Sequence, residues 1–325
     1  MGSDSDEWTS SDSEDEDLFG DSSVGSSDDD SDVDGAPKGV VKREAPAKSI
    51  AVLSKDEKIA QLMETSIATQ RQKVLETSEI VIFLSSTFNG MRDEREIFTN
   101  RYLPMLKSKA GESGVRVKMF DMRWGITVEQ SNNSETLKIC MNGVVDCNIF
   151  IGFYGARYGS CYVKSDPHTH WVQKEFPMAA EKHPWVTTKI NRNRSVTELE
   201  FRGGWLNDPG CRPACYFFRD SEWDREQIAK MEAMTPEELK EHGDHPRHYR
   251  NKHPPHDKAL RDLQEECETI SETYTYYAPG EFAQQSYEKI SKWIAQLLPS
   301  LDSTEMATED AAHKVRHVLA QFPPF

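Results

Sequence analysis

The stretch IVIFLSSTFNGMRDEREIF, residues 80–98, sets the fold class. It begins with five apolar residues, IVIFL, and a continuous apolar run of this length is typical of a central parallel strand covered on both faces. Three hydroxyl residues, Ser85, Ser86 and Thr87, follow at once. The rest of the stretch is charged and has helical spacing, with two carboxylates where a helix would begin. The pattern therefore predicts a strand, a polar loop and a helix in succession.

The same alternation continues along the chain. Apolar runs predict further strands, and amphipathic spacing predicts helices between them. The predicted strands are 80–84, 115–120, 148–155, 214–218 and 273–277, and the predicted helices are 54–75, 93–106, 134–145, the start of 195–205, 256–270 and 283–298. Pro104 is expected to kink or end the helix that it lies in. We predict an α/β domain with a doubly wound, flavodoxin-like parallel sheet.

Charge divides the chain into unequal parts. Residues 1–34 hold fourteen Asp or Glu and no Lys or Arg, whereas the other 291 residues hold 41 acidic and 39 basic side chains. Such a segment cannot bury a core, so we predict a disordered acidic tail over 1–50. The predicted organisation is this tail, a helical linker (51–77), the α/β domain (78–300) with a charged, His-rich insertion (222–262), and a C-terminal helix (301–325).

Composition argues against several classes of partner. The chain has no basic stripe that would indicate a nucleic-acid partner, and no apolar run approaches the roughly 20 residues that a membrane span needs. Its N-terminus is unlike a signal peptide, so we expect a cytoplasmic protein. The six cysteines have neither a CxxC pair nor zinc spacing, so we expect free thiols and no metal site.

The predicted linker helix has two open interpretations. Ser54 and Glu57 form a capping-box pattern, and an apolar stripe follows at helical spacing. The stripe contains Ile59, Leu62, Met63 and Ile67. It either pairs with another chain and supports self-association, or packs on its own domain.

Polar residues gather where the predicted strands end. In doubly wound folds ligands bind at the carboxyl ends of the strands, so the hydroxyls after the first strand either bind an anion or a sugar or only cap the loop. Arg92, Arg95 and Arg123 either hold a phosphate or form salt bridges, and Trp124 either stacks on a base or belongs to the core. The candidate ligand-binding residues are Ser85, Ser86, Thr87, Arg92, Arg123, Trp124, Tyr154 and Arg157.

Four ordered blocks carry a family resemblance: VIFLSSTFNGMRDERE, FDMRWGIT, IFIGFYGARYG and SVTELEF. They resemble the domain of unknown function DUF4062, a TIR-like module. It occurs at the N-terminus of NACHT or STAND nucleotide-switch proteins, including nephrocystin-3-like, telomerase-associated-protein-like and TPR- or WD-repeat regulators. The resemblance covers about residues 78–220. It implies a cytoplasmic, in some relatives cilium-associated, signalling module. The chain has no GxxxxGK[ST] motif, so we expect a fragment or a stand-alone form that hydrolyses no ATP.

Two function classes follow from the resemblance. The first is a protein-interaction module that self-associates or docks partners. The second is a TIR-like enzyme that cleaves NAD or another nucleotide, with NAD as substrate and no cofactor. The resemblance then implies Glu200 or Glu198 as the catalytic carboxylate, with Glu175 of HWVQKEF as the alternative. Glu198 is also explained as the partner of Ser195 in a capping box.

The insertion holds a group of five histidines, within EHGDHPRHYRNKHPPH. Imidazoles at this density could hold a transition metal together with Asp244. Three prolines, Pro246, Pro254 and Pro255, favour instead a flexible, solvated loop.

Overall fold

The computed structural model describes residues 53–121 and 135–298. The predicted acidic tail, the predicted C-terminal helix, Arg123 and Trp124 lie outside these residues. In the described part, no helix is both long enough and apolar enough to cross a membrane. None of the six cysteines forms a disulfide bond.

The described residues build one five-stranded, all-parallel sheet, as predicted. Its strand order is β2-β1-β3-β4-β5, the flavodoxin-like order. Every residue of β3 and β4 is buried, which explains their continuous apolar runs. The strands are β1 (Glu79–Ser85), β2 (Arg116–Phe120), β3 (Ile149–Tyr154), β4 (Ala214–Arg219) and β5 (Glu272–Tyr276).

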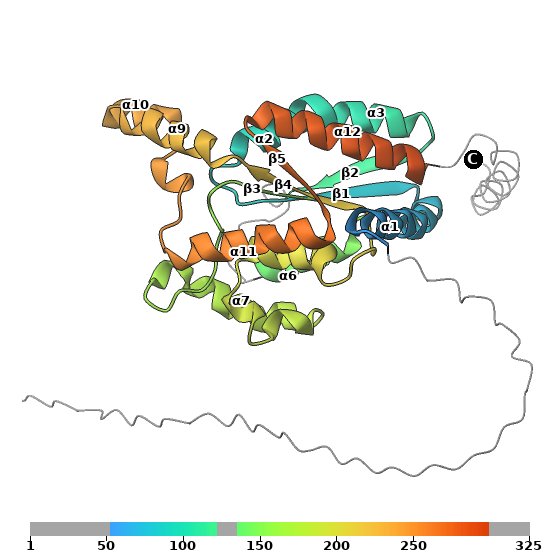
Figure 1. Cartoon of the computed structure of the whole chain (residues 1–325), viewed down its shortest axis with the longest axis horizontal. Coiled ribbons are helices and arrows are strands. Elements are labelled where there is room, and N and C mark those ends of the chain that lie inside the picture. Colours follow the sequence, from blue (N-terminus) through green and yellow to red (C-terminus); the bar gives the residue numbers. More distant parts are fainter. Residues whose placement is uncertain (1–52, 122–134, 299–325) are drawn as a thin grey trace, which may run out of the picture. The chain divides into compact units, whose positions relative to one another are not determined.

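Helices cover both faces of the sheet (Figure 1). On one face lie α2 (Arg92–Ile97), α3 (Leu103–Gly111) and α12 (Pro279–Leu297). On the other lie α6 (Thr136–Asp146), α8 (Val196–Phe201) and α11 (Pro255–Ile270), with α7 (His170–Ala180) outside α6. Shorter helical segments are η1 (Phe98–Tyr102), η2 (Pro167–Thr169), η3 (Pro184–Thr187), η4 (Asn191–Asn193), η5 (Arg202–Leu206) and η6 (Pro246–His248).

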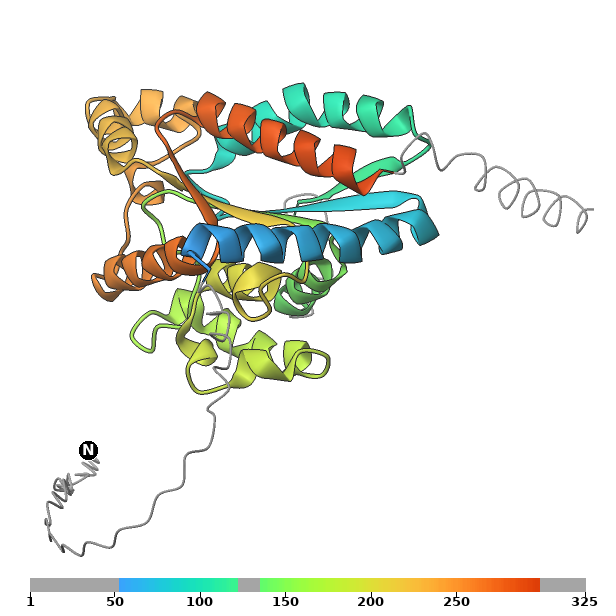
Figure 2. The same cartoon turned by 45° about the vertical axis from the view of Figure 1, so that its right-hand side comes forward.

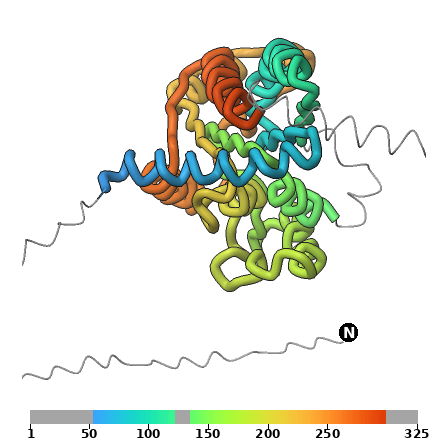
Figure 3. The backbone as a smooth tube through the Cα atoms, turned by 90° about the vertical axis from the view of Figure 1, so that its right-hand side faces the viewer, coloured from blue at the N-terminus to red at the C-terminus, as the bar shows by residue number. Residues whose placement is uncertain are grey.

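The first helix, α1 (Lys55–Thr77), crosses the amino ends of the strands (Figures 2 and 3). It begins with the predicted capping box, in which Ser54 and Glu57 bond to each other's backbone. Its stripe is turned toward its own domain, because Ile59 and Met63 are buried. Gln70 donates to the carbonyl of Cys211 at 2.7 Å. The stripe is therefore covered by its own chain, in agreement with the second interpretation of the linker.

The insertion contains α9 (Ser221–Glu232), α10 (Pro236–His242) and η6. Its His-rich segment, where a loop was predicted, is irregular between α10 and α11 apart from η6. The prolines start helices: Pro246 opens η6, and Pro255 opens α11. The first helical position tolerates proline, because its missing N–H would have no partner there. Asp244 then holds the segment together by accepting hydrogen bonds from His248 and Tyr249.

Pro104 lies inside a continuous helical run and does not end it. It is the second residue of α3 and follows the π-helical segment η1. Proline cannot donate to the preceding turn, and the wider π turn accommodates that missing bond. The helix after β1 thus continues through three segments, α2, η1 and α3.

Candidate functional site

A pocket of about 150 Å³ opens at the carboxyl ends of β1 and β3. The order of the strands reverses between these two, and this is where doubly wound folds bind ligands. We call it the Glu200 pocket. Its lining includes Ser86, Thr87, Arg95, Cys140, Arg157 and Glu200.

Glu200 lies on α8 and is only 5% exposed. Its Oε2 accepts a hydrogen bond of 2.6 Å from the Oγ of Ser85 at the end of β1. Burial raises the pKa of Glu200 to about 7, although hydrogen bonds with Ser85 and Cys140 act in the opposite direction. A carboxyl group that gains and loses a proton near neutral pH, inside a pocket, is suited to general acid and base chemistry.

The remaining hydroxyls of the cluster serve the loop and a buried arginine. Arg95 on α2 donates to the Oγ of Ser86 and to Oδ1 of Asp121, each at 2.9 Å. Arg95 and Asp121 both have side chains that are 1% exposed. Thr87 donates to the carbonyl of Asn89 at 3.3 Å. Arg95 therefore brings a paired positive charge to the pocket wall, and Ser86 and Thr87 stabilise the turn.

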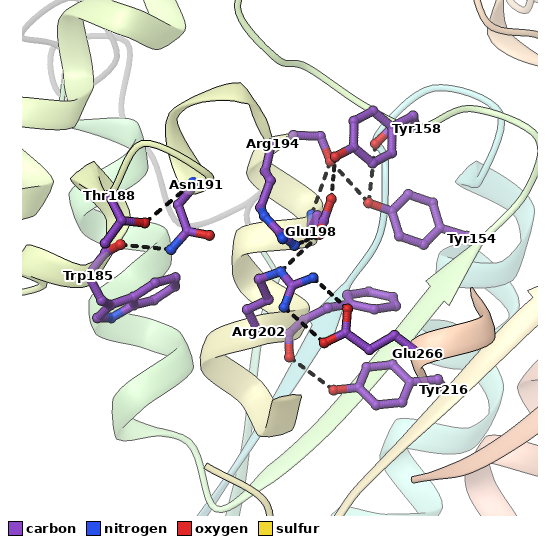
Figure 4. Close-up of polar contacts among 12 residues, drawn as sticks. Tyr154, Tyr158, Trp185, Thr188, Asn191, Arg194, Glu198, Arg202, Tyr216 and Glu266 are labelled. Atoms are coloured by element: carbon purple, nitrogen blue, oxygen red, sulfur yellow. Dashed lines mark hydrogen bonds and ion pairs between the residues drawn. The ribbon is translucent and has the colours of Figure 1, made fainter. Parts of the chain in front are cut away.

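Glu198 points into a different set of contacts (Figure 4). Its backbone N–H donates to the Oγ of Ser195, the predicted N-cap. Its carboxylate accepts from Arg194, Arg202 and Tyr158 instead of returning to the backbone of Ser195. Burial raises the pKa of Glu198 to about 7. Two guanidinium groups at hydrogen-bonding distance favour the ionised form, so we assign Glu198 to the packing of α8.

Glu175, the alternative carboxylate, caps a neighbouring helix. Its Oε2 accepts from the backbone N–H of Leu137 in the first turn of α6, at 2.6 Å. A carboxylate at this position satisfies a free N–H group and complements the helix dipole. Burial raises its pKa. Glu175 does not line the Glu200 pocket.

Of the other predicted residues, some line the pocket and some do not. Arg157 lines the pocket. Arg92 is exposed and pairs with Glu96 on the surface of α2, away from the pocket. Tyr154 is fully buried and does not line the pocket. Its hydroxyl donates to the carbonyl of Tyr158 at 3.1 Å and so stabilises the loop after β3. Arg123 and Trp124 lie outside the described residues.

The predicted set of site residues did not include Cys140, Phe88 and Trp171, which also line this pocket. Cys140 on α6 hydrogen bonds with Glu200, and burial raises the thiol pKa well above its ordinary value. Phe88 and Trp171 line the pocket while remaining 48% and 38% exposed. Cys140 fell on the apolar side of a predicted helix, where a cysteine is ordinarily a core residue. The helix that carries Trp171 had too weak a pattern to be predicted.

The pocket alone is smaller than the roughly 300 Å³ at which small-molecule sites begin. A larger ligand would have to extend beyond it. In the part of the chain that the structure describes, no group of three or more His, Cys, Asp or Glu side chains is placed to hold a metal ion.

Comparison with known proteins gives one family and several relatives. The family model described as "Domain of unknown function (DUF4062)" matches residues 81–275. A TPR repeat-containing protein of Dictyostelium discoideum is 30% identical over 224 residues, which are 68% of this chain and 13% of that protein. Telomerase protein component 1 of Rattus norvegicus is 32% identical over 146 residues, 42% of this chain and 5% of that protein. Its counterpart in Mus musculus is 31% identical over 152 residues, 44% of this chain and 5% of that protein. No solved structure shows a significant match.

Proposed function

Since the chain belongs to the DUF4062 family, we propose that it is an N-terminal signalling module that acts through protein contacts, by self-association or by docking a partner. The similar regions are small parts of long proteins, one named as a TPR repeat-containing protein and the other as a protein component of telomerase. This context supports a module within a larger protein. From the resemblance of the sequence blocks, we propose that the larger protein is a regulator of the NACHT or STAND type.

The observation that carries the proposal is the pair of exposed aromatic side chains at the Glu200 pocket. Phe88 lies in the loop between β1 and α2, and Trp171 lies in the first turn of α7. Both line the pocket and both remain partly exposed to solvent. Aromatic side chains of this kind are enriched in protein interfaces, where they contribute much of the binding energy.

Light scattering on the full chain across a concentration series tests self-association. We expect the mass to rise with concentration, and a Phe88→Ala, Trp171→Ala double variant to remain monomeric. Met105→Ala is the control, because Met105 is an exposed apolar residue of similar accessibility on α3. A monomer at every concentration for the unmodified chain would contradict self-association. An unchanged mass in the double variant would contradict the role of the two aromatics.

A second function, cleavage of NAD or a related nucleotide, is favoured by the placement of Glu200. A buried carboxyl at the strand switch point could stabilise a cationic ribose in the transition state when ionised. Ser85 would orient it through the 2.6 Å hydrogen bond. The module would then be a TIR-like hydrolase.

Release of nicotinamide from NAD by concentrated full-length protein tests this second function. Glu200→Gln should abolish release without unfolding the chain, whereas Glu181→Gln, at an exposed carboxyl, should not change it. Absence of release by the unmodified protein would rule out NAD as the substrate. Loss of release only in Glu175→Gln would assign the chemistry to α7.

A further inference from the structure

A second, larger pocket adjoins the Glu200 pocket. Its volume is about 440 Å³, and the loop after β3 and the insertion line it. The two pockets share four lining residues, Asn89, Arg157, Gly159 and Ser160. We call it the cationic pocket, because it is lined by four basic side chains, Arg157, Arg247, Arg250 and Lys252, against one carboxylate, Asp166.

Some of these positive charges are already compensated. Lys252 Nζ lies 2.5 Å from Oδ2 of Asp166. Arg250 reaches Glu232 at 3.4 Å. Within the described ranges, the side chains of Arg157 and Arg247 make neither an ion pair nor a hydrogen bond. Two guanidinium groups that form no ion pair with a carboxylate of the described residues therefore line one cavity.

Arg157 is partly buried, so its charge is incompletely hydrated. Burial lowers the pKa of its guanidinium and the positive charge of Arg247 lowers it further, whereas the negative charge of Asp244 acts in the opposite direction. The net effect disfavours the cationic form. An anion placed between the two side chains would remove the repulsion and supply hydrogen-bond acceptors to both.

The backbone holds this arrangement in place. Gly159 has φ +99°, and a Cβ there would lie 3.1 Å from Oγ1 of Thr197 and 3.3 Å from Cγ2 of Thr87. The loop that carries Arg157 therefore packs closely over the strand ends. On the insertion side, Asn251 accepts from the backbone N–H of Tyr158 at 2.8 Å and donates to the carbonyl of Ala156 at 2.8 Å. These bonds fix the segment of Arg247 to the segment of Arg157.

We propose that Arg157 and Arg247 form a binding site for the phosphate or pyrophosphate group of a small phosphorylated molecule. A guanidinium group matches the geometry of phosphate oxygens and can donate two hydrogen bonds to them. The pocket is concave and within the volume range of small-ligand sites, which favours a small molecule over an extended peptide. The remainder of the ligand would extend toward the Glu200 pocket, because the two pockets share a wall.

Calorimetric titration of the full chain with inorganic phosphate, pyrophosphate and ADP tests this site. We expect pyrophosphate to bind more tightly than phosphate, and Arg157→Gln and Arg247→Gln each to weaken binding about tenfold or more. Arg247 is exposed, so its variant should fold normally, and Arg157→Lys provides a second variant that keeps the charge but loses the forked geometry. The control is Arg116→Gln, which removes the same charge from an exposed arginine on β2.

The outcomes separate the phosphate group from the rest of the ligand. Equal affinity for pyrophosphate and ADP supports a site that recognises only the phosphate groups. Tighter binding of ADP supports a ligand that also has a nucleoside part. Failure of all three probes to bind at millimolar concentration would overturn the proposal. Equal weakening in Arg116→Gln would also overturn it, since the effect would then come from net charge. These titrations require neither turnover nor self-association, so their failure leaves the proposed function untouched.

Discussion

Ser85 Oγ and Glu200 Oε2 lie 2.6 Å apart and join the end of β1 to α8 across 115 positions of sequence. Both side chains are buried. The last residue of a central strand therefore holds the carboxyl group whose pKa burial has raised to about 7. The three hydroxyls after β1 have different partners. Ser85 donates to Glu200 in the pocket, whereas Ser86 and Thr87 donate to carbonyls of the loop and Ser86 also accepts from Arg95.

The raised pKa of Glu200 predicts a pH-dependent stability. Its pKa lies near 4.5 in the unfolded chain and at about 7 in the folded one, so the folded state binds more protons between these values. Its favourable contribution is complete below pH 4.5 and is lost as pH rises through 7. Glu200→Gln should therefore gain stability relative to the unmodified chain by about 3 kcal/mol between pH 4.5 and 8. Urea unfolding at several pH values measures this, and parallel curves for the two proteins would refute it.

The hydrogen bond itself predicts a coupling between the two residues. A double-mutant cycle with Ser85→Ala and Glu200→Gln should give a coupling energy of about 1–2 kcal/mol at pH 8, where Glu200 is mostly ionised. The coupling should be smaller at pH 5, because a neutral acceptor forms a weaker bond. Free energies of unfolding at both pH values provide the measurement. Additive effects at pH 8 would show that the contact contributes little.

A buried charge cluster at the carboxyl end of β4 predicts a larger effect. Arg219 at the end of β4 bonds to Glu94 at 2.5 Å and also to Asp224, and all three side chains are at most 2% exposed. Arg219→Met should cost about 3–5 kcal/mol of stability, because two carboxylates would remain buried without their cation. The matched control is Arg92→Met, whose exposed pair with Glu96 should be worth less than about 1 kcal/mol. Similar losses in both variants, measured by denaturant unfolding, would contradict the argument.

The strands were predictable because the burial of each strand is visible in its own short stretch of sequence. A central parallel strand is covered on both faces, so IVIFL and NIFIGFYG are continuous apolar runs that no other element explains as well. The helix 283–298 was equally predictable from its amphipathic spacing. Ile290, Ile294 and Leu297 are buried on one face of α12. Local pattern and final environment agree at these elements.

The site was only partly predictable, because its contacts are long-range. No local pattern pairs Ser85 with Glu200, or separates Glu200 from Glu198, two residues away on the same short helix. That distinction depends on Arg194 and Arg202, which bind Glu198. In the His-rich segment the prolines indicated a loop, and residues 243–254 are irregular apart from η6. The same prolines did not reveal that Pro246 and Pro255 occupy first helical positions, because proline is common both in loops and at helix starts.

The contact between the β1–α2 loop and the insertion gives the last prediction. Gly90 has φ +77°, and a Cβ there would lie 2.3 Å from the carbonyl oxygen of His248 in η6. Gly114 has a similar φ, +72°, with nothing within 4 Å of such a Cβ. Each Gly→Ala change carries the backbone penalty of about 1–2 kcal/mol, but only Gly90→Ala must also displace η6. Gly90→Ala should therefore lose more stability than Gly114→Ala, and hydrogen exchange over residues 244–253 should quicken only in Gly90→Ala. Equal losses with unchanged exchange would mean that the insertion does not depend on this contact for its position.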